Sequence, residues 1–102
     1  TTYGSAATKR KIYIGKVTNY FSNLSVAEIK LEAGDLSRGD TILITGPTTG
    51  IEEHTVSDLR DEATNPAEKV SKGTLCSVHL PAQVRRSDKV FRWVDASTLK
   101  RG

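Results

Sequence analysis

The stretch LSRGDTILITGPTTG, which runs from Leu36 to Gly50, decides the fold. It contains a tight Gly39-Asp40 turn, then an apolar run, then a second turn rich in Gly and Pro. Turn residues on both sides of a short apolar run are typical of hairpins in a small antiparallel β-barrel. The three successive apolar residues Ile42-Leu43-Ile44 predict a strand covered on both faces. Covering its outer face would require a loop or another domain.

Composition limits the class of protein. The 102 residues suit one domain, and 36% of them are hydrophobic while 26% are charged. No apolar run approaches the roughly 20 residues of a membrane helix, and no signal-peptide pattern is present, so we expect a cytoplasmic protein. The formal charge of +3 permits contact with a polyanion but does not argue for one.

The chain contains no methionine, which favours a piece of a longer protein. Small and polar residues at its beginning predict a flexible lead-in or linker over residues 1–10. The β-barrel domain is expected over residues 11–95. A C-terminal tail is expected over residues 96–102.

Periodicity predicts six strands. Val26–Leu31 shows the cleanest alternation, with Ala27, Ile29 and Leu31 on one face. In the first strand Gly15 predicts a bulge or sharp bend, and Leu36 is expected to close the barrel as a plug. No internal repeat stands out. Together these features predict a barrel or a sandwich of six short strands, near residues 11–20, 26–31, 41–45, 51–59, 74–80 and 88–94.

Candidate catalytic groups are few. Cys76 and His79 are three apart in a predicted strand, so they point to opposite faces, and Cys76 shares its face with apolar neighbours. With His54 as the second histidine, the spacing does not suggest zinc. The acidic residues between 52 and 62 read as a solvated surface rather than a catalytic pair. We therefore expect no catalytic residue, no metal site and no cofactor.

Basic residues concentrate near the two ends of the chain. If the first and last strands are neighbours, these residues could form one patch, with Tyr13, Phe91 and Trp93 as stacking surfaces. Two interpretations stay open, a solvated face with packed aromatics and a contact with structured RNA. The basic residues concerned are Lys9, Arg10, Lys11, Lys16, Arg85, Arg86, Lys89, Arg92, Lys100 and Arg101.

Three motifs together carry a family resemblance. They are YIGKVTNY at 13–20, VAEI at 26–29 followed by the 36–50 stretch, and AEKVSKG at 67–73 leading to VRRSDKVF at 84–91. In these the chain resembles the C-terminal domain of the collagenase-like peptidases of unknown catalytic type, family thirty-two of the U class. The resemblance covers roughly residues 12–94.

The resemblance implies a six-stranded closed antiparallel barrel like the second domain of translation elongation factors, in which the barrel packs on a neighbouring domain and can touch tRNA. It also implies that the catalytic residues lie in a larger N-terminal region, so none is carried over to this chain. Some relatives hydroxylate tRNA or ribosomal RNA instead of cutting protein. The parent protein is therefore expected to be a peptidase, with an RNA hydroxylase as the alternative.

These inferences predict a non-catalytic accessory domain. It would dock on the catalytic domain of its own parent chain and help to position a macromolecular substrate. The candidates for docking are Leu43, Phe91 and Trp93. The candidates for contact with substrate or RNA are Arg85, Arg86, Lys89 and Arg92. Cleavage by the isolated chain is not expected, and the sequence leaves the oligomeric state open.

Overall fold

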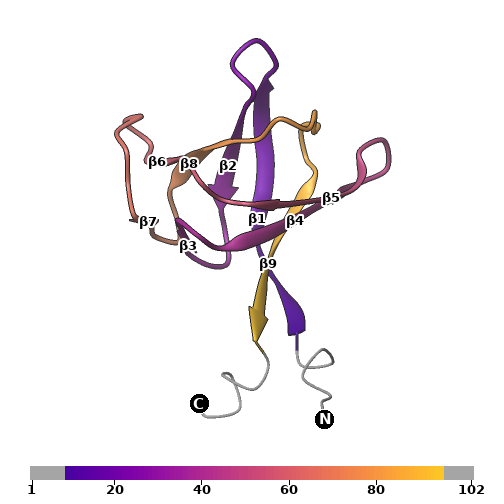
Figure 1. Cartoon of the computed structure of the whole chain (residues 1–102), viewed down its shortest axis with the longest axis horizontal. Helices are drawn as coiled ribbons and strands as arrows, with labels where there is room; N and C mark the ends of the chain where they lie inside the picture. Colours follow the sequence, from indigo (N-terminus) through magenta and orange to yellow (C-terminus); the bar gives the residue numbers. More distant parts are fainter. Residues whose placement is uncertain (1–8, 96–102) are drawn as a thin grey trace.

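The computed structural model describes residues 9–95, which contain nine β-strands and no helix. Seven strands form one curled antiparallel sheet in the order β5-β4-β9-β1-β2-β8-β6, and β3 pairs with β7 in a small second sheet (Figure 1). The strands are β1 (Lys9–Phe21), β2 (Val26–Leu31), β3 (Leu36–Ser37), β4 (Thr41–Gly46), β5 (Gly50–Thr55), β6 (Leu59–Arg60), β7 (Lys69–Val70), β8 (Leu75–His79) and β9 (Lys89–Asp95).

The predicted six-stranded closed barrel is wrong in its strand count and in its closure. The main sheet has two ends, β5 and β6, and within residues 9–95 no ladder joins them. These two edge strands follow each other in the sequence and are separated by residues 56–58 only. The short β3, β6 and β7 strands escape prediction because two residues are too few to show an alternation.

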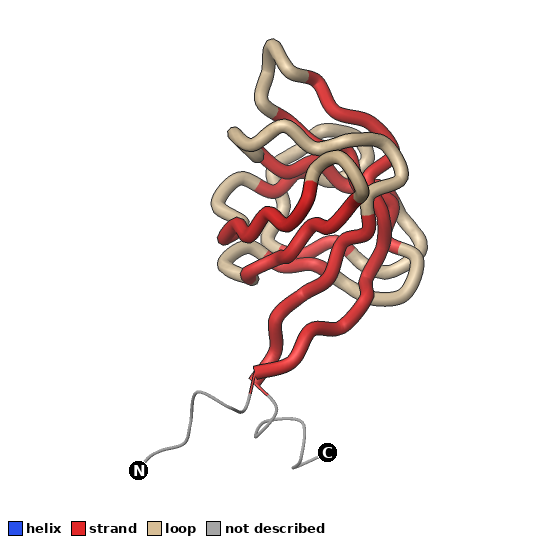
Figure 2. The backbone as a smooth tube through the Cα atoms, turned by 90° about the vertical axis from the view of Figure 1, so that its right-hand side faces the viewer, coloured by secondary structure: helices blue, strands red, loops and turns tan. Residues whose placement is uncertain are grey.

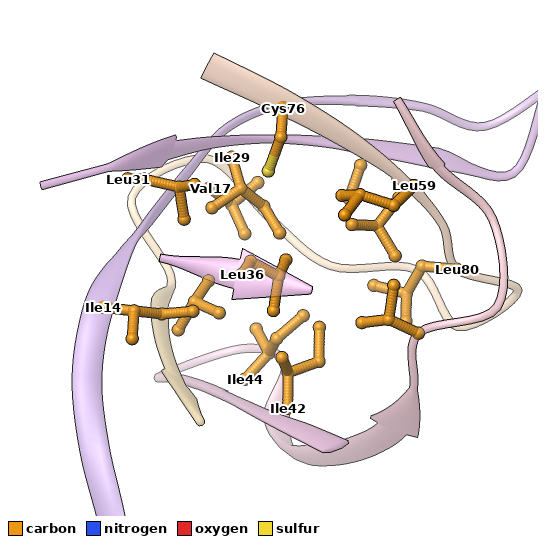
Figure 3. Packing of buried hydrophobic residues seen from close by; sticks show 14 of the residues in the cluster. Ile14, Val17, Ile29, Leu31, Leu36, Ile42, Ile44, Leu59, Cys76 and Leu80 are labelled. Atoms are coloured by element: carbon orange, nitrogen blue, oxygen red, sulfur yellow. The ribbon is translucent and has the colours of Figure 1, made fainter. Parts of the chain in front are cut away.

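The core is almost entirely aliphatic. Alternate residues of β2 point inward, so Ala27, Ile29 and Leu31 are fully buried as predicted. Leu36 is also fully buried, and Figure 3 shows it in the middle of the labelled side chains. Each buried Ile or Leu side chain contributes roughly 1.5–3 kcal/mol when it leaves water. Burial of these residues stabilises the described part of the chain.

Gly15 produces the predicted irregularity in β1. The β1–β9 register shifts between Tyr13 and Gly15, and a Cβ atom at Gly15 would lie 1.9 Å from the carbonyl oxygen of Lys30. Only glycine therefore allows β2 to approach β1 this closely. The bulge bends β1 where it passes from the body of the sheet to its projecting end.

A four-residue turn leads into β4 and has a defined hydrogen-bond pattern. Gly39 has a φ of 93°, its N–H donates to the carbonyl of Val56 (2.8 Å), and the N–H of Val56 donates to the carbonyl of Asp40 (2.8 Å). This is the G1 bulge, whose first residue adopts a left-handed conformation. The Asp40 carboxylate accepts a further bond from the N–H of Ser37 (2.9 Å).

The same turn occurs twice more, at 71–74 before β8 and at 85–88 before β9. Gly73 and Ser87 take the place of Gly39, with φ angles of 95° and 76°, and their N–H groups donate to Leu31 and Val17. The expectation of no internal repeat misses this short motif, which reads SRGD, SKGT and RRSD in the sequence. Strands β4, β8 and β9 therefore each follow the same type of turn.

The predicted lead-in and tail fall mostly on residues 1–8 and 96–102, which lie outside the described residues. Lys9 and Arg10, assigned to the lead-in, belong to β1. The remaining long strands begin and end within two residues of their predicted bounds, except that the segment 51–59 divides into β5 and the start of β6.

Replacement of Ser87 by glycine should stabilise the domain by about 0.5–1 kcal/mol. A non-glycine residue in the left-handed region costs roughly 1–2 kcal/mol, and the greater freedom of glycine in the unfolded chain offsets part of that gain. Urea unfolding measures the change. Gly39→Ser is the matched control and should destabilise the domain, since a non-glycine residue is strained at its φ of 93°. No clash would contribute, because a Cβ there meets no other atom within 4 Å. A lower midpoint for Ser87→Gly would contradict this account of the turn.

Candidate docking surface

Strand β9 organises the surface that the predicted site residues occupy. It pairs with β1 on one side and with β4 on the other, which confirms that the first and last strands are neighbours. The pairing with β4 ends at Arg92 and the pairing of β1 with β2 ends at Gly15. Beyond those points β1 and β9 have only each other as partners, and they leave the body as a two-stranded ribbon (Figures 1 and 2).

Aromatic and cationic side chains lie together on the outer face where the ribbon begins. Tyr13 and Phe91 are directly opposite in register and meet edge to face, with ring centroids 5.7 Å apart and an interplanar angle of 70°. The Lys11 Nζ lies 4.8 Å from the centroid of Phe91, a cation–π distance. Lys11 is in turn opposite Trp93, which is half-buried.

Leu43 stands opposite Phe91 on the neighbouring strand β4. It is only 7% exposed, so this chain covers most of it without another domain. The predicted cover on both faces of Ile42-Leu43-Ile44 is therefore confirmed, and this chain supplies it. Of the three predicted docking residues, Phe91 and Trp93 offer more surface than Leu43.

The predicted basic patch divides between two faces. Lys89 lies on the outer face, whereas Arg92, three residues further along the strand, points to the opposite one. There the Arg92 guanidinium lies 3.6 Å from the Asp40 carboxylate. Arg85 and Arg86 are exposed on the turn before β9. Lys100 and Arg101 lie outside the described residues.

Three lysines form a row across the outer face of the sheet. Lys16 of β1 is directly opposite Lys30 of β2 on one side and Lys89 of β9 on the other, and all three are exposed. The Lys16 Nζ lies 3.7 Å from a carboxylate oxygen of Glu32. Lys30 is absent from the predicted patch because only the register places it there.

Asp88 holds the start of β9 and is the one charged side chain buried within residues 9–95, with 3% exposure. Its carboxylate accepts hydrogen bonds from the Thr49 hydroxyl and from the N–H of Arg85 (2.8 Å). A Cβ atom on Gly46 would lie 2.0 Å from the same carboxylate. Asp88 therefore joins the β4–β5 hairpin to the turn at 85–88, a role that its place in the RRSD motif could have indicated.

Two shallow hollows meet at Ser87. One is lined by β4 and β5 residues with Ser87 and Lys89, the other by Pro47 and Thr48 with the 85–88 turn. Both are open at the surface, and neither contains a paired nucleophile and base. The hollows place Lys89, Arg85 and Arg86 around the tip of the β4–β5 hairpin.

The thiol shows no sign of catalytic activation. Cys76 is 1% exposed and points into the aliphatic core (Figure 3), and this burial, with a smaller effect of Glu28, raises the pKa of Cys76 to about 12. His79 is exposed on the opposite face of β8. Residues 9–95 hold no group of three His, Cys, Asp or Glu side chains that could bind a metal ion.

The ionisation of Tyr13 is displaced as well. Its hydroxyl donates to Glu32 (2.8 Å), and this bond, followed by burial and the Glu32 charge, raises the pKa of Tyr13. Glu32 thus contacts both Tyr13 and Lys16 and links the aromatic side chains to the lysines.

The described part of the chain contains no helix of the length and apolarity needed to cross a membrane.

Known proteins match this chain over most of its length. It is 48% identical over 91 residues to a collagenase of Porphyromonas gingivalis strain W83 and 43% identical over 88 residues to an uncharacterized protease of Methanocaldococcus jannaschii. The predicted resemblance to the collagenase-like peptidase family is confirmed. The matches cover 89% and 86% of this chain, which spans about a fifth of the two relatives, 22% and 21%. The chain matches no family model.

The same fold occurs in solved structures. The C-terminal domain of a Geobacillus thermoleovorans protein named as a U32 peptidase superposes with a TM-score of 0.73 at 13% identity, covering 79% of this chain and 91% of that one. Its selenomethionine variant gives a TM-score of 0.71 at 14% identity, covering 76% and 95%. This chain therefore has the fold of that C-terminal domain.

The Cys76 thiol should resist alkylation in the folded domain at pH 8 and react after unfolding in urea, because only the thiolate is a nucleophile. Since its folded pKa of about 12 exceeds the ordinary 9.0, its contribution to stability is fully present below pH 9. That contribution is lost as pH rises from 9 toward 12. The free energy of unfolding of the apolar variant Cys76→Val should therefore fall less steeply than that of the wild type between pH 9 and 12. Equal iodoacetamide labelling rates for folded and unfolded protein would contradict the burial of the thiol.

Proposed function

We propose that this U32-type domain is a non-catalytic module that docks on the catalytic region of its parent protein and helps to position a macromolecular substrate. The observation that carries the proposal is the β1–β9 ribbon, which leaves the body of the sheet with aromatic side chains on it. A two-stranded ribbon without further partners is only marginally stable in water. Contact along the ribbon would therefore stabilise both the ribbon and the complex.

The chemistry of the ribbon suits a protein interface. Aromatic residues are enriched in the buried centre of such interfaces, and Phe91 and Trp93 lie two apart on the same face of β9. Tyr13 and Lys11 extend that face across β1. Leu43 completes the proposed docking surface at its inner edge, although it is mostly covered already.

Substrate contact is assigned to the turn before β9 and to the strand itself. Arg85 and Arg86 are exposed, and within residues 9–95 neither guanidinium lies within ion-pair distance of a carboxylate. Lys89 borders the hollow beside them. Arg92 is the weakest of the four candidates for substrate contact, because its guanidinium already pairs with Asp40 and its side chain is only 31% exposed. A cytoplasmic parent with peptidase activity is part of this proposal.

The second candidate is contact with RNA in a hydroxylase of the same family. The exposed Arg85–Arg86 pair favours it, because arginine side chains without carboxylate partners suit phosphate groups. It would agree with the predicted likeness to the second domain of translation elongation factors, which stays a prediction. Such binding would weaken steeply with salt.

Trp93→Ala should weaken docking at least about 10-fold, because truncation of a central interface aromatic commonly costs 2 kcal/mol or more. The 102-residue chain is added to the rest of the longer protein, and affinity is measured by calorimetry. Leu24→Ala is the matched control, since Leu24 is 64% exposed in the turn between β1 and β2, at the opposite end of β1 from the ribbon. Equal affinities for wild type and Trp93→Ala would contradict docking through the ribbon. Salt-sensitive RNA binding lost in Arg85→Glu with Arg86→Glu would favour the second candidate.

A further inference from the structure

We infer that the lysine row, Lys30-Lys16-Lys89, is the electrostatic half of the docking surface and faces a carboxylate-rich surface of the parent's catalytic region. This inference rests on the proposed function and specifies the chemistry of its partner. Like charges directly opposite each other on neighbouring strands destabilise a sheet. Among the described residues only Lys16 of this row has a carboxylate partner, Glu32 at 3.7 Å, and an acidic partner surface would supply counter-charges for Lys30 and Lys89.

Continuity with the ribbon links the row to the same interface. Lys89 is two residues before Phe91 on the outer face of β9, and Lys16 follows the Gly15 bulge on β1. Glu32 touches both groups, because it accepts from Tyr13 and lies 3.7 Å from Lys16. One partner surface could therefore cover the aromatic side chains and the lysines together.

The distribution of charge along the chain also indicates which face meets an acidic partner. Residues 35–68, which include β3 to β6, contain eight Asp or Glu against two Arg. The other described residues, which include β1, β2 and β9, contain eleven Lys or Arg against four Asp or Glu. An acidic surface would be repelled by the first group of strands and attracted by the second.

A protein surface fits this face better than a nucleic acid does. Binding of unpaired bases requires open aromatic faces, whereas Lys11 lies over the Phe91 ring and the Tyr13 ring meets Phe91 edge to face. The carboxylate of Glu32 among the lysines would also repel phosphates. An aromatic centre bordered by a polar rim is the ordinary arrangement of a protein interface.

Charge reversal tests the inference. Lys30→Glu and Lys89→Glu, made separately, should each weaken association with the rest of the longer protein at least about 10-fold at 50 mM NaCl, and the difference should shrink at 500 mM as salt screens the charges. Neither change should lower the melting temperature of the isolated domain, since each replaces a like-charge pair by an attractive one. Lys72→Glu, an exposed lysine on the turn before β8, is the matched control and should bind as wild type.

The outcomes separate this inference from the proposed function. Absence of wild-type association at low salt would defeat both. Association that depends on Trp93 but is unchanged by Lys30→Glu and Lys89→Glu would keep the docking proposal and overturn the lysine row. Lysine variants that lose binding to a structured RNA while they keep association with the rest of the protein would assign the row to RNA and overturn it as well.

Discussion

The buried carboxylate of Asp88 is the constraint on which the arrangement of this domain depends. A carboxylate that has lost almost all contact with water is costly unless hydrogen bonds replace its hydration, and here the Thr49 hydroxyl and the Arg85 N–H supply them. The backbone of Asp88 is also engaged, since its carbonyl accepts from Val17 of β1 (2.8 Å). One residue thus joins the β4–β5 hairpin, strand β1 and the turn that starts β9.

The start of β9 determines where its side chains point. Because a strand alternates its faces, a shift of one residue would move Lys89, Phe91 and Trp93 from the outer face to the inner one. The bulge opposite Val17 fixes that register at one end, and the Gly15 bulge adjusts β1 to it. The lysine row and the aromatic cluster are therefore consequences of how β9 begins, and the proposed docking surface inherits its geometry from the fold.

Much of the fold could be predicted from local residue patterns. Val26–Leu31 alternates cleanly, Gly15 marks a bulge, and the GPTTG sequence forms the β4–β5 hairpin turn. Closure of the sheet could not be predicted, because it depends on whether β5 and β6 exchange hydrogen bonds, and no local pattern contains that information. The role of Asp88 was hidden for a different reason, since an aspartate at a strand start reads as a surface residue until its burial is known.

The candidate site was also predictable only in part. Phe91 and Trp93 could be assigned to one face from their spacing alone, and the pairing of the first and last strands was a reasonable expectation for a barrel. The grouping of Arg92 with Lys89 failed because their spacing of three sends them to opposite faces, where Arg92 meets Asp40. Lys30 entered the site only through its register opposite Lys16, which depends on the pairing of strands and not on either strand by itself.

Amide hydrogen exchange of the Asp88→Ala variant tests this account most directly. Loss of the carboxylate leaves a hydroxyl and an N–H without their acceptor, at a cost of about 2 kcal/mol. We therefore expect the amides of β9 to exchange on the order of 30-fold faster, with a smaller change in β2 and β8. Unchanged protection of β9 would contradict the claim that Asp88 fixes the start of this strand.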